Sequence, residues 1–164
     1  MKPQMSNRQS LRVPGYDYAS GGAYFVTVCT KDRKCIFGTV DGTSVKLTLP
    51  GRVAEESWRW LAERYSFVRL DEWILMPNHL HAIIWLENSC SKPLGSLIGA
   101  YKTVSSKRIK ELLGPMERIW QRNYHEHIIR SEKSLCALRQ YILDNPCQWQ
   151  LDKENPASEE FHAP

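Results

Sequence analysis

The pattern of hydrophobic positions along the chain first predicts strands. Residues 23–29 are β-branched and aromatic almost throughout, which is typical of a strand. Two further apolar runs, 67–76 and 79–86, are separated by the turn residues Pro77 and Asn78, and so predict a β-hairpin in the centre of a sheet. Weaker patterns predict an edge strand over 45–49 that Pro50 ends, and a strand over 118–121 that 127–130 continues.

Hydrophobic residues at helical spacing predict three helices between and after these strands. They cover 52–64, 94–113 and 131–145, with Ser131 as a good N-cap and Pro146 ending the last helix. The order is strand, helix, strand, strand, helix, strand, followed by one extra helix. This is the split βαββαβ pattern of an α+β, ferredoxin-like fold, in which an antiparallel sheet carries two helices on one face. We expect the extra helix to cover the opposite face.

The two ends of the chain differ from the segment between them. Residues 1–22 are rich in Gly, Ser, Pro and Tyr without a period, and residues 1–14 carry three cations and no acid, so 1–22 is predicted to be a basic arm. Residues 23–149 are expected to form the folded domain, and 150–164 an acidic, flexible tail. A length of 164 residues and a hydrophobic share of 42% are those of one soluble globular domain.

Cysteine usage and the lack of long apolar runs predict a cytoplasmic protein. The five cysteines form no CxxC pair, their number is odd, and the N-terminus lacks the apolar centre of a signal peptide. We therefore expect reduced thiols rather than disulfides. No apolar run approaches the length of a membrane span, so no membrane partner is expected.

Two histidines one residue apart, His79 and His81, are candidate metal ligands. Side chains alternate between the faces of a strand, so both rings point the same way. On the last predicted helix, Tyr141 and Asn145 are four residues apart and share a face. Asn145 falls within the apolar stripe of that helix, where a buried amide needs a partner. If the helix packs on the histidine face, a metal held by His79, His81 and the Asn145 oxygen would lie beside Tyr141.

This constellation suits covalent phosphoryl chemistry. A tyrosine hydroxyl is a weak nucleophile because its pKa is about 10. A divalent metal on a scissile phosphate neutralises charge and orients the phosphate for in-line attack. Attack by tyrosine yields a phosphotyrosine that keeps the bond energy for a later rejoining step. Ligation by nitrogen and oxygen without thiolate fits Mg²⁺ or Mn²⁺, with Mn²⁺ better suited to imidazole.

Other residues compete for these roles. His125 and His127 form a second histidine pair that could hold a metal, and Tyr124 is a rival nucleophile. Glu126 is either a solvated charge or an acid behind the site. Asn145 also has an ordinary structural role open to it, as the residue that ends a helix before a proline.

The distribution of charge predicts contact with nucleic acid. Net charge is only +4, but residues 92–110 contain five cations and no acid. Concentrated basic segments suit a polyanion partner. The candidate DNA-binding residues are Arg8 and Arg12 of the arm, with Lys102, Lys107, Arg108 and Lys110 of the second helix.

Taken together, these motifs resemble the REP-associated tyrosine transposases, relatives of the single-tyrosine insertion-sequence transposases in the HUH endonuclease superfamily. The resemblance covers most of the chain. It is carried by Pro14-Gly-Tyr-Asp-Tyr18, Gly22-Ala-Tyr-Phe-Val-Thr27, Met76-Pro-Asn-His-Leu-His81, Trp120-Gln-Arg-Asn-Tyr-His-Glu-His127-Ile-Ile-Arg130 and Tyr141-Ile-Leu-Asp-Asn145-Pro146. It implies that His79, His81 and Asn145 bind the metal, that Tyr141 is the nucleophile, and that His127 supports the site by hydrogen bonding.

The resemblance also implies a function. A member of this family is a metal-dependent endonuclease and strand transferase that acts on single-stranded DNA with short palindromic hairpins, the REP elements. It cuts beside the hairpin and leaves a 5′-phosphotyrosine and a free 3′-OH. We expect a monomer or homodimer. A hairpin-binding protein without turnover is an alternative on the same fold, whereas a zinc hydrolase of small molecules would explain neither Tyr141 nor the basic segments.

Overall fold

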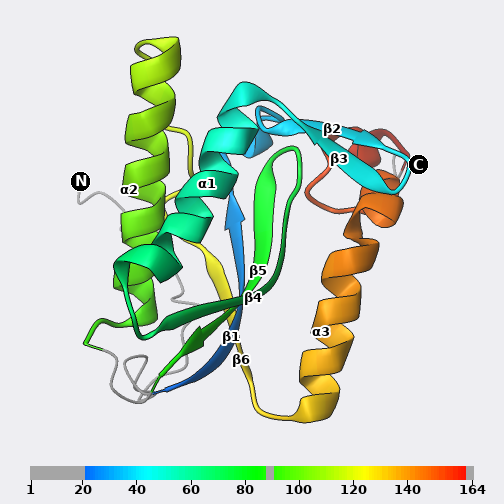
Figure 1. Ribbon diagram of the computed structural model, residues 1–164. Helices are drawn as coiled ribbons and strands as arrows, with labels where there is room; N and C mark the ends of the chain where they lie inside the picture. Colours follow the sequence, from blue (N-terminus) through cyan, green and yellow to red (C-terminus); the bar gives the residue numbers. More distant parts are fainter. Residues whose placement is uncertain (1–20, 88–90, 162–164) are drawn as a thin grey trace, which may run out of the picture.

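The computed structural model describes residues 21–87 and 91–161, and it contains one four-stranded antiparallel sheet (Figure 1). Its strands are β1 (Gly22–Cys29), β4 (Val68–Leu75), β5 (His79–Leu86) and β6 (His125–Ile129), in the order β4-β5-β1-β6. The central strands β1 and β5 pair along their full length, from Gly22 opposite Leu86 to Cys29 opposite His79. The predicted α+β fold is confirmed. The predicted hairpin is also present, but β4 is an edge strand rather than a central one.

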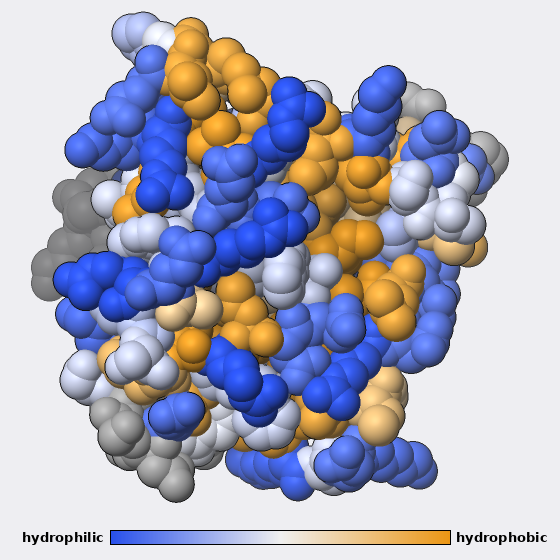
Figure 2. Space-filling model, viewed as in Figure 1, coloured by the Kyte–Doolittle hydropathy of each residue, from blue (hydrophilic) through white to orange (hydrophobic). Residues whose placement is uncertain are grey.

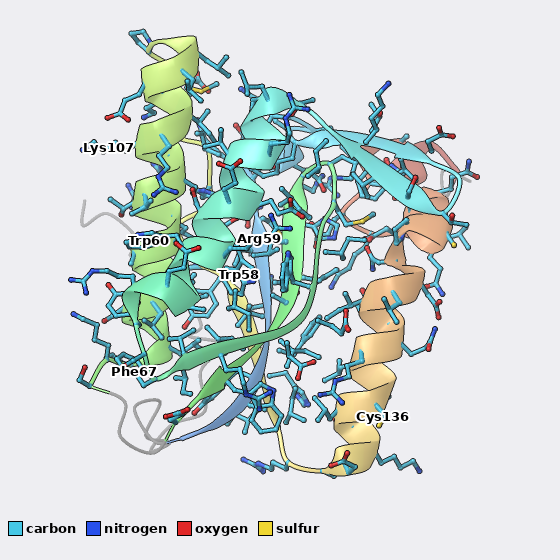
Figure 3. The ribbon with its side chains drawn as sticks, in the orientation of Figure 1. Trp58, Arg59, Trp60, Phe67, Lys107 and Cys136 are labelled. Atoms are coloured by element: carbon cyan, nitrogen blue, oxygen red, sulfur yellow. The ribbon has the colours of Figure 1, made fainter. Side chains whose placement is uncertain are left out.

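Three helices cover the two faces of this sheet (Figure 1). Helices α1 (Leu49–Arg64) and α2 (Leu94–Leu113) lie on one face, and α3 (Glu132–Asp144) lies on the other. The larger core is between the sheet and the first two helices, where Trp58 and Tyr101 are fully buried and meet edge to face at 5.2 Å. Figure 3 shows Trp58 on the side of α1 that faces the sheet. The predicted placement of the last helix on the histidine face is confirmed.

A second, two-stranded sheet lies outside the four-stranded sheet. It consists of β2 (Gly38–Asp41) and β3 (Ser44–Leu47), and the predicted edge strand 45–49 belongs to it rather than to the main sheet. Figure 2 shows hydrophobic side chains between this hairpin and α3, where they line a hollow of about 330 Å³. Ile142 and Pro146 of the α3 end line the same hollow. The hairpin therefore flanks the segment that carries Asn145.

Pro50 begins α1 instead of ending a strand. The Thr48 hydroxyl caps the helix by accepting a hydrogen bond from the Gly51 amide, and a proline in the first turn needs no amide partner. A Cβ on Gly51 would lie 2.0 Å from the carbonyl oxygen of Phe37, so only glycine permits this approach. The predicted strand 118–121 is reduced to a single bridge between Trp120 and Thr30.

Residues 150–161 differ from the flexible tail that is predicted over 150–164. The chain continues from α3 directly into a 3₁₀ helix, η2 (Asn145–Leu151), and a second one, η3 (Pro156–Phe161). Asn155 and Ser158 are buried, and Arg33 and Asn78 donate hydrogen bonds to the carbonyls of this segment. Its polar groups are therefore paired with the domain, which an acidic composition does not reveal.

Residues 1–20 of the predicted arm, including Arg8 and Arg12, lie outside the described residues. Gly22 is the first residue of β1 rather than the last of the arm. Within 21–87 and 91–161, no helix is long and apolar enough to cross a membrane.

Candidate active site

His79 and His81 lie side by side on β5 and are almost completely buried, with exposed fractions of 0% and 5%. Their ring centroids are 4.4 Å apart. Each Nδ1 has a polar partner at 2.8 Å: the Asn78 Oδ1 for His79 and the Thr27 hydroxyl for His81. The Nε2 atoms are therefore left to face α3 and the C-terminal segment.

The partners of Asn78 decide which nitrogen of His79 carries the proton. The Asn78 amide group donates to the carbonyls of Arg33 and Glu154, so its oxygen accepts from the Nδ1–H of His79. The Nε2 of His79 then presents a lone pair. Burial lowers the pKa of His79 to about 4, and burial together with the neighbouring His79 lowers the pKa of His81. Both rings are thus neutral at neutral pH, the form that binds metal.

Helix α3 brings the two residues predicted from its sequence to these histidines. The helix begins at the Ser131 cap, and Leu135 and Ile142 bury its apolar stripe against the sheet. The Tyr141 hydroxyl is 3.4 Å from the Nε2 of His81, and its side chain is 41% exposed. Burial raises the pKa of Tyr141, as does the charge of Asp152, while Asn145 opposes both. Tyr141 is therefore half-open to solvent at the edge of a buried cluster.

Asn145 is buried at the junction of α3 and η2, with an exposed fraction of 2%. Its amide is close enough to His79 and Tyr141 to influence the pKa of each. Its Oδ1 has no hydrogen-bond partner among the described residues, and neither has the Nε2 of His79. The structure therefore brings all four predicted residues together.

Asp152 completes the cluster, although its sequence position suggested a solvated tail. Its side chain is only 9% exposed, and its Oδ2 lies 3.8 Å from the Nε2 of His79. One ligand atom each from His79, His81 and Asp152 lies within 4.8 Å of the others. Trp149, half-buried and 6.1 Å from the His79 ring, was the signal in the sequence that the fold continues past Pro146.

These residues fit a divalent metal. Buried polar atoms normally have partners, so the orphaned Nε2 of His79 and Oδ1 of Asn145 point to a ligand between them. Two imidazoles, a carboxylate and an amide oxygen form a mixed nitrogen and oxygen donor set. The cluster can therefore hold a divalent metal, with Asp152 as an additional donor.

Comparison with known proteins now gives the family. The family model described as "Transposase IS200 like" matches residues 19–145. The chain belongs to this family. Two relatives come from Haemophilus influenzae strain Rd. One, an uncharacterized protein, is 34% identical over 90% of this chain and 92% of its own. The other, provisionally named a REP-associated tyrosine transposase, is 28% identical over 79% of this chain and 73% of its own.

Solved structures show the same fold. A REP-associated tyrosine transposase bound to a REP hairpin matches with a TM-score of 0.65 at 21% identity, over 84% of this chain and 73% of that one. A protein described as a transposase candidate from Deinococcus radiodurans matches with a TM-score of 0.52 at 18% identity, over 80% of this chain and 94% of that one. The predicted resemblance to the REP-associated tyrosine transposases is confirmed, and the family is one of DNA-processing enzymes.

The rival residues predicted from the sequence do not join the cluster. The Tyr124 hydroxyl donates to Glu126 at 2.8 Å, and its ring faces the Lys102 ammonium. His125 and His127 are exposed on β6, on the far side of β1 from His81. The hydrogen bonds of the described residues include none from His127 to His79 or His81, so its supporting role stays a prediction.

The cations of the predicted basic helix form two sets of side chains. Lys102, Lys107 and Lys110 line a groove of about 830 Å³ together with Arg118 and Arg122. Figure 3 labels Lys107 on this helix, α2. Arg108 instead faces α1, where its guanidinium contacts the Ser57 hydroxyl and the Trp60 ring.

Lys102 also has a structural task. Its ammonium donates to the carbonyls of residues 121, 122 and 123, and burial lowers its pKa to about 8. Lys107 and Lys110 are therefore the better candidates for DNA contact among the four predicted cations of α2.

Proposed function

We propose that the protein is a metal-dependent endonuclease and strand transferase that cleaves single-stranded DNA beside REP-like hairpins through a 5′-phosphotyrosine intermediate. The observation that carries this is the position of the Tyr141 hydroxyl, 3.4 Å from the Nε2 of His81 at the edge of a buried cluster of metal-binding side chains. Membership of a transposase family supports a DNA substrate. The REP hairpin in the structure of a related fold supports hairpin DNA as the partner.

Some residues of the site would hold a metal, and others fix the orientation of the metal-binding side chains. His79, His81, Asn145 and Asp152 would hold Mg²⁺ or Mn²⁺, which when bound neutralises the scissile phosphate and orients it. Thr27 and Asn78 fix the two imidazole rings from behind.

Tyr141 is the nucleophile in this proposal. Its oxygen forms a bond to phosphorus, the bond from phosphorus to the 3′ oxygen breaks, and the 3′ end leaves as a hydroxyl. Its ring is held between two neighbours, at 6.0 Å from Phe25 and 5.3 Å from His81, which aims the hydroxyl at the cluster. The exposed part of the side chain leaves an approach for the phosphate.

The cations of the α2 groove would contact the phosphates of the hairpin. Lys107 and Lys110 lie along this groove, and phosphate contacts of this kind position a nucleic acid without reading its sequence. Arg8 and Arg12 of the arm are proposed as further contacts on charge alone.

The test is a search for the covalent adduct. Labelled single-stranded DNA carrying a REP hairpin is incubated with the protein and Mn²⁺ or Mg²⁺, and the products are separated on a denaturing gel. We expect an adduct that requires metal and is absent from Tyr141→Phe and His79→Ala. Tyr124→Phe is the matched control and should retain it.

Two results would contradict the proposal. Tight binding of the hairpin without any adduct would favour the alternative, a hairpin-binding protein without turnover. An adduct that survives Tyr141→Phe would show that another residue is the nucleophile.

A further inference from the structure

A second pair of histidines lies on the same face of the sheet as the candidate active site. His125 on β6 is opposite Thr27 on β1, and Thr27 is opposite His81 on β5. His127 is opposite Phe25, whose ring stacks on His81 at 5.4 Å. Residues paired across strands point to the same face, so both β6 histidines project on the face of His81. Two strand spacings separate them from β5, roughly 10 Å.

These two histidines differ from His79 and His81 in exposure. His79 and His81 are buried, whereas His125 and His127 are exposed on an edge strand. Among the described residues, the cluster suited to a metal contains neither of them. They form instead a polar rim, which we define as His125 and His127, and His127 is paired with Phe25, whose ring lies 6.0 Å from the ring of the half-exposed Tyr141. Exposed imidazoles can hydrogen-bond to a nucleotide or stack on its base.

A basic hollow lies near the start of β6, the strand that carries this rim. It measures about 800 Å³ and is lined by Lys31, Asp32, Arg33, Arg118, Gln121, Arg122 and Asn123. Arg118, Gln121 and Arg122 also line the α2 groove, so the two concave surfaces are continuous. Asn123 is two residues from His125, which places the hollow at the start of β6.

The same hollow is joined to the active site by hydrogen bonds. The carbonyl of Arg33, one of its lining residues, accepts from the Asn78 amide at 3.0 Å. Asn78 in turn accepts from the Nδ1 of His79 at 2.8 Å. Two hydrogen bonds therefore connect the wall of the hollow to His79, a candidate metal ligand.

We propose that the single strand flanking the hairpin runs through this hollow and over the polar rim to reach Tyr141. This inference rests on the proposed function for the identity of the DNA. Single-stranded DNA offers phosphates to cations and base faces to flat rings. Arg118 and Arg122 supply the cations, because Lys31 is already paired with Asp32 and Glu117. His125 and His127 supply the rings next to the scissile phosphate.

The experiment compares binding of two DNAs, the hairpin alone and the same hairpin with a single-stranded flank, by fluorescence anisotropy without metal. The variants are Arg122→Ala and the double variant His125→Ala/His127→Ala. Lys46→Ala, an exposed cation on the β2–β3 hairpin, is the control. We expect the flank to increase wild-type affinity, and each path variant to bind the flanked hairpin about tenfold more weakly.

Binding of the DNA hairpin without a flank tests whether each variant is folded and whether its α2 groove is intact. The double histidine variant should bind it like the wild type, and Lys46→Ala should bind both DNAs like the wild type. Equal affinity of the wild type and the double histidine variant for the flanked hairpin would overturn the inference. So would a wild type that gains nothing from the flank.

A second measurement locates the strand directly. Flanks carrying 5-iodouracil at single positions are photocrosslinked, and the attached peptide is identified by mass spectrometry. Crosslinks within 118–127 are expected, and crosslinks confined to other surfaces would contradict the path. Failure of the wild type to bind any hairpin or to form an adduct would overturn the proposed function itself, which separates the two outcomes.

Discussion

At the scale of single residues, the hydrogen bonds behind the histidines decide which ring atoms face the cluster. The Thr27 hydroxyl contacts the Nδ1 of His81, and the Asn78 oxygen contacts the Nδ1 of His79, both at 2.8 Å. Such partners fix the orientation and the tautomer of a metal-binding imidazole. The affinity of the site for metal therefore depends on residues that do not touch the metal.

Replacing Thr27 by valine tests this dependence. The change keeps the shape of a buried side chain but removes the hydroxyl, so His81 loses its fixed orientation. We expect the affinity for Mn²⁺ to fall roughly 10- to 100-fold, measured by titration calorimetry. Thr39→Val, an exposed threonine on β2, should leave it unchanged. Unchanged affinity in Thr27→Val would show that His81 needs no such support.

The residues of the candidate site were largely predictable because two short periodicities place them. Strand alternation puts His79 and His81 on one face, and helical spacing puts Tyr141 and Asn145 on another. Neither strand alternation nor helical spacing places Asp152 at the site. It reaches the site because η2 turns the chain back, and because Asn78 and Arg33 bind the carbonyls of the neighbouring residues. Such long-range hydrogen bonds leave no pattern in the sequence.

At the scale of elements, a partly buried ion pair attaches α3 to the sheet. The Arg139 guanidinium donates two hydrogen bonds of 2.7 Å to Asp71 on β4, and the Trp85 indole donates a third at 2.8 Å. Pairing of β4 with β5 shifts register between Leu70 and Trp73, and this bulge contains Asp71. Arg139 is two residues before Tyr141, so the ion pair also positions the proposed nucleophile.

Asp71→Asn should loosen this attachment. We expect a loss of about 2 kcal/mol in the free energy of unfolding in urea, because hydrogen bonds to a charged group are lost. We also expect slower formation of the covalent adduct with unchanged hairpin affinity. Glu72→Gln, the exposed neighbour, is the control for both measurements. Equal adduct rates in Asp71→Asn and wild type would mean that α3 is held by its apolar contacts alone.

The same ion pair predicts a dependence of stability on pH. The Arg139 guanidinium holds the pKa of Asp71 well below its usual range. The unfolded carboxyl has a pKa of about 3.9, so this stabilisation is complete above about pH 5 and is lost progressively as the pH falls below 4. Urea unfolding between pH 6 and pH 3 should therefore show a steeper loss for the wild type than for Asp71→Asn. Parallel curves would contradict the assignment.

The order of the main elements followed from the sequence because each has a strong period and a clear end signal. The β2–β3 hairpin was not predicted as a hairpin, because its strands are only four residues long and half exposed. Pro50 lies in the first turn of α1 rather than at the end of a strand, and the sequence alone does not decide this because proline suits both places. What decides between them is the Thr48 cap and the close approach of Gly51 to Phe37.

At the scale of the whole molecule, the cations of α2 lie on different sides of the helix. Lys107 and Lys110 line the groove, whereas Arg108 packs against α1. Net charge or the sequence run alone cannot separate the two sets, because all of these cations lie within the same turns.

The salt dependence of hairpin binding should distinguish Lys107 and Lys110 from Arg108. Each lysine that contacts a phosphate releases a counterion, so Lys107→Ala and Lys110→Ala should each reduce the slope of log affinity against log salt by about one. Arg108→Ala should leave the slope unchanged. A slope that falls with Arg108→Ala but not with the lysines would place the DNA on the other side of the helix.

The short connection between β6 and α3 has a consequence for mixed populations of chains. Only Arg130 and Ser131 separate the two elements. The connection keeps α3 next to the sheet of its own chain, where the Tyr141 hydroxyl lies 3.4 Å from the Nε2 of His81. We therefore expect that two differently damaged chains do not complement each other. An equal mixture of Tyr141→Phe and His79→Ala chains should form no adduct, and restored activity on the same gel would mean that the helices are exchanged. We therefore expect each chain to form the adduct only through its own Tyr141 and its own histidines.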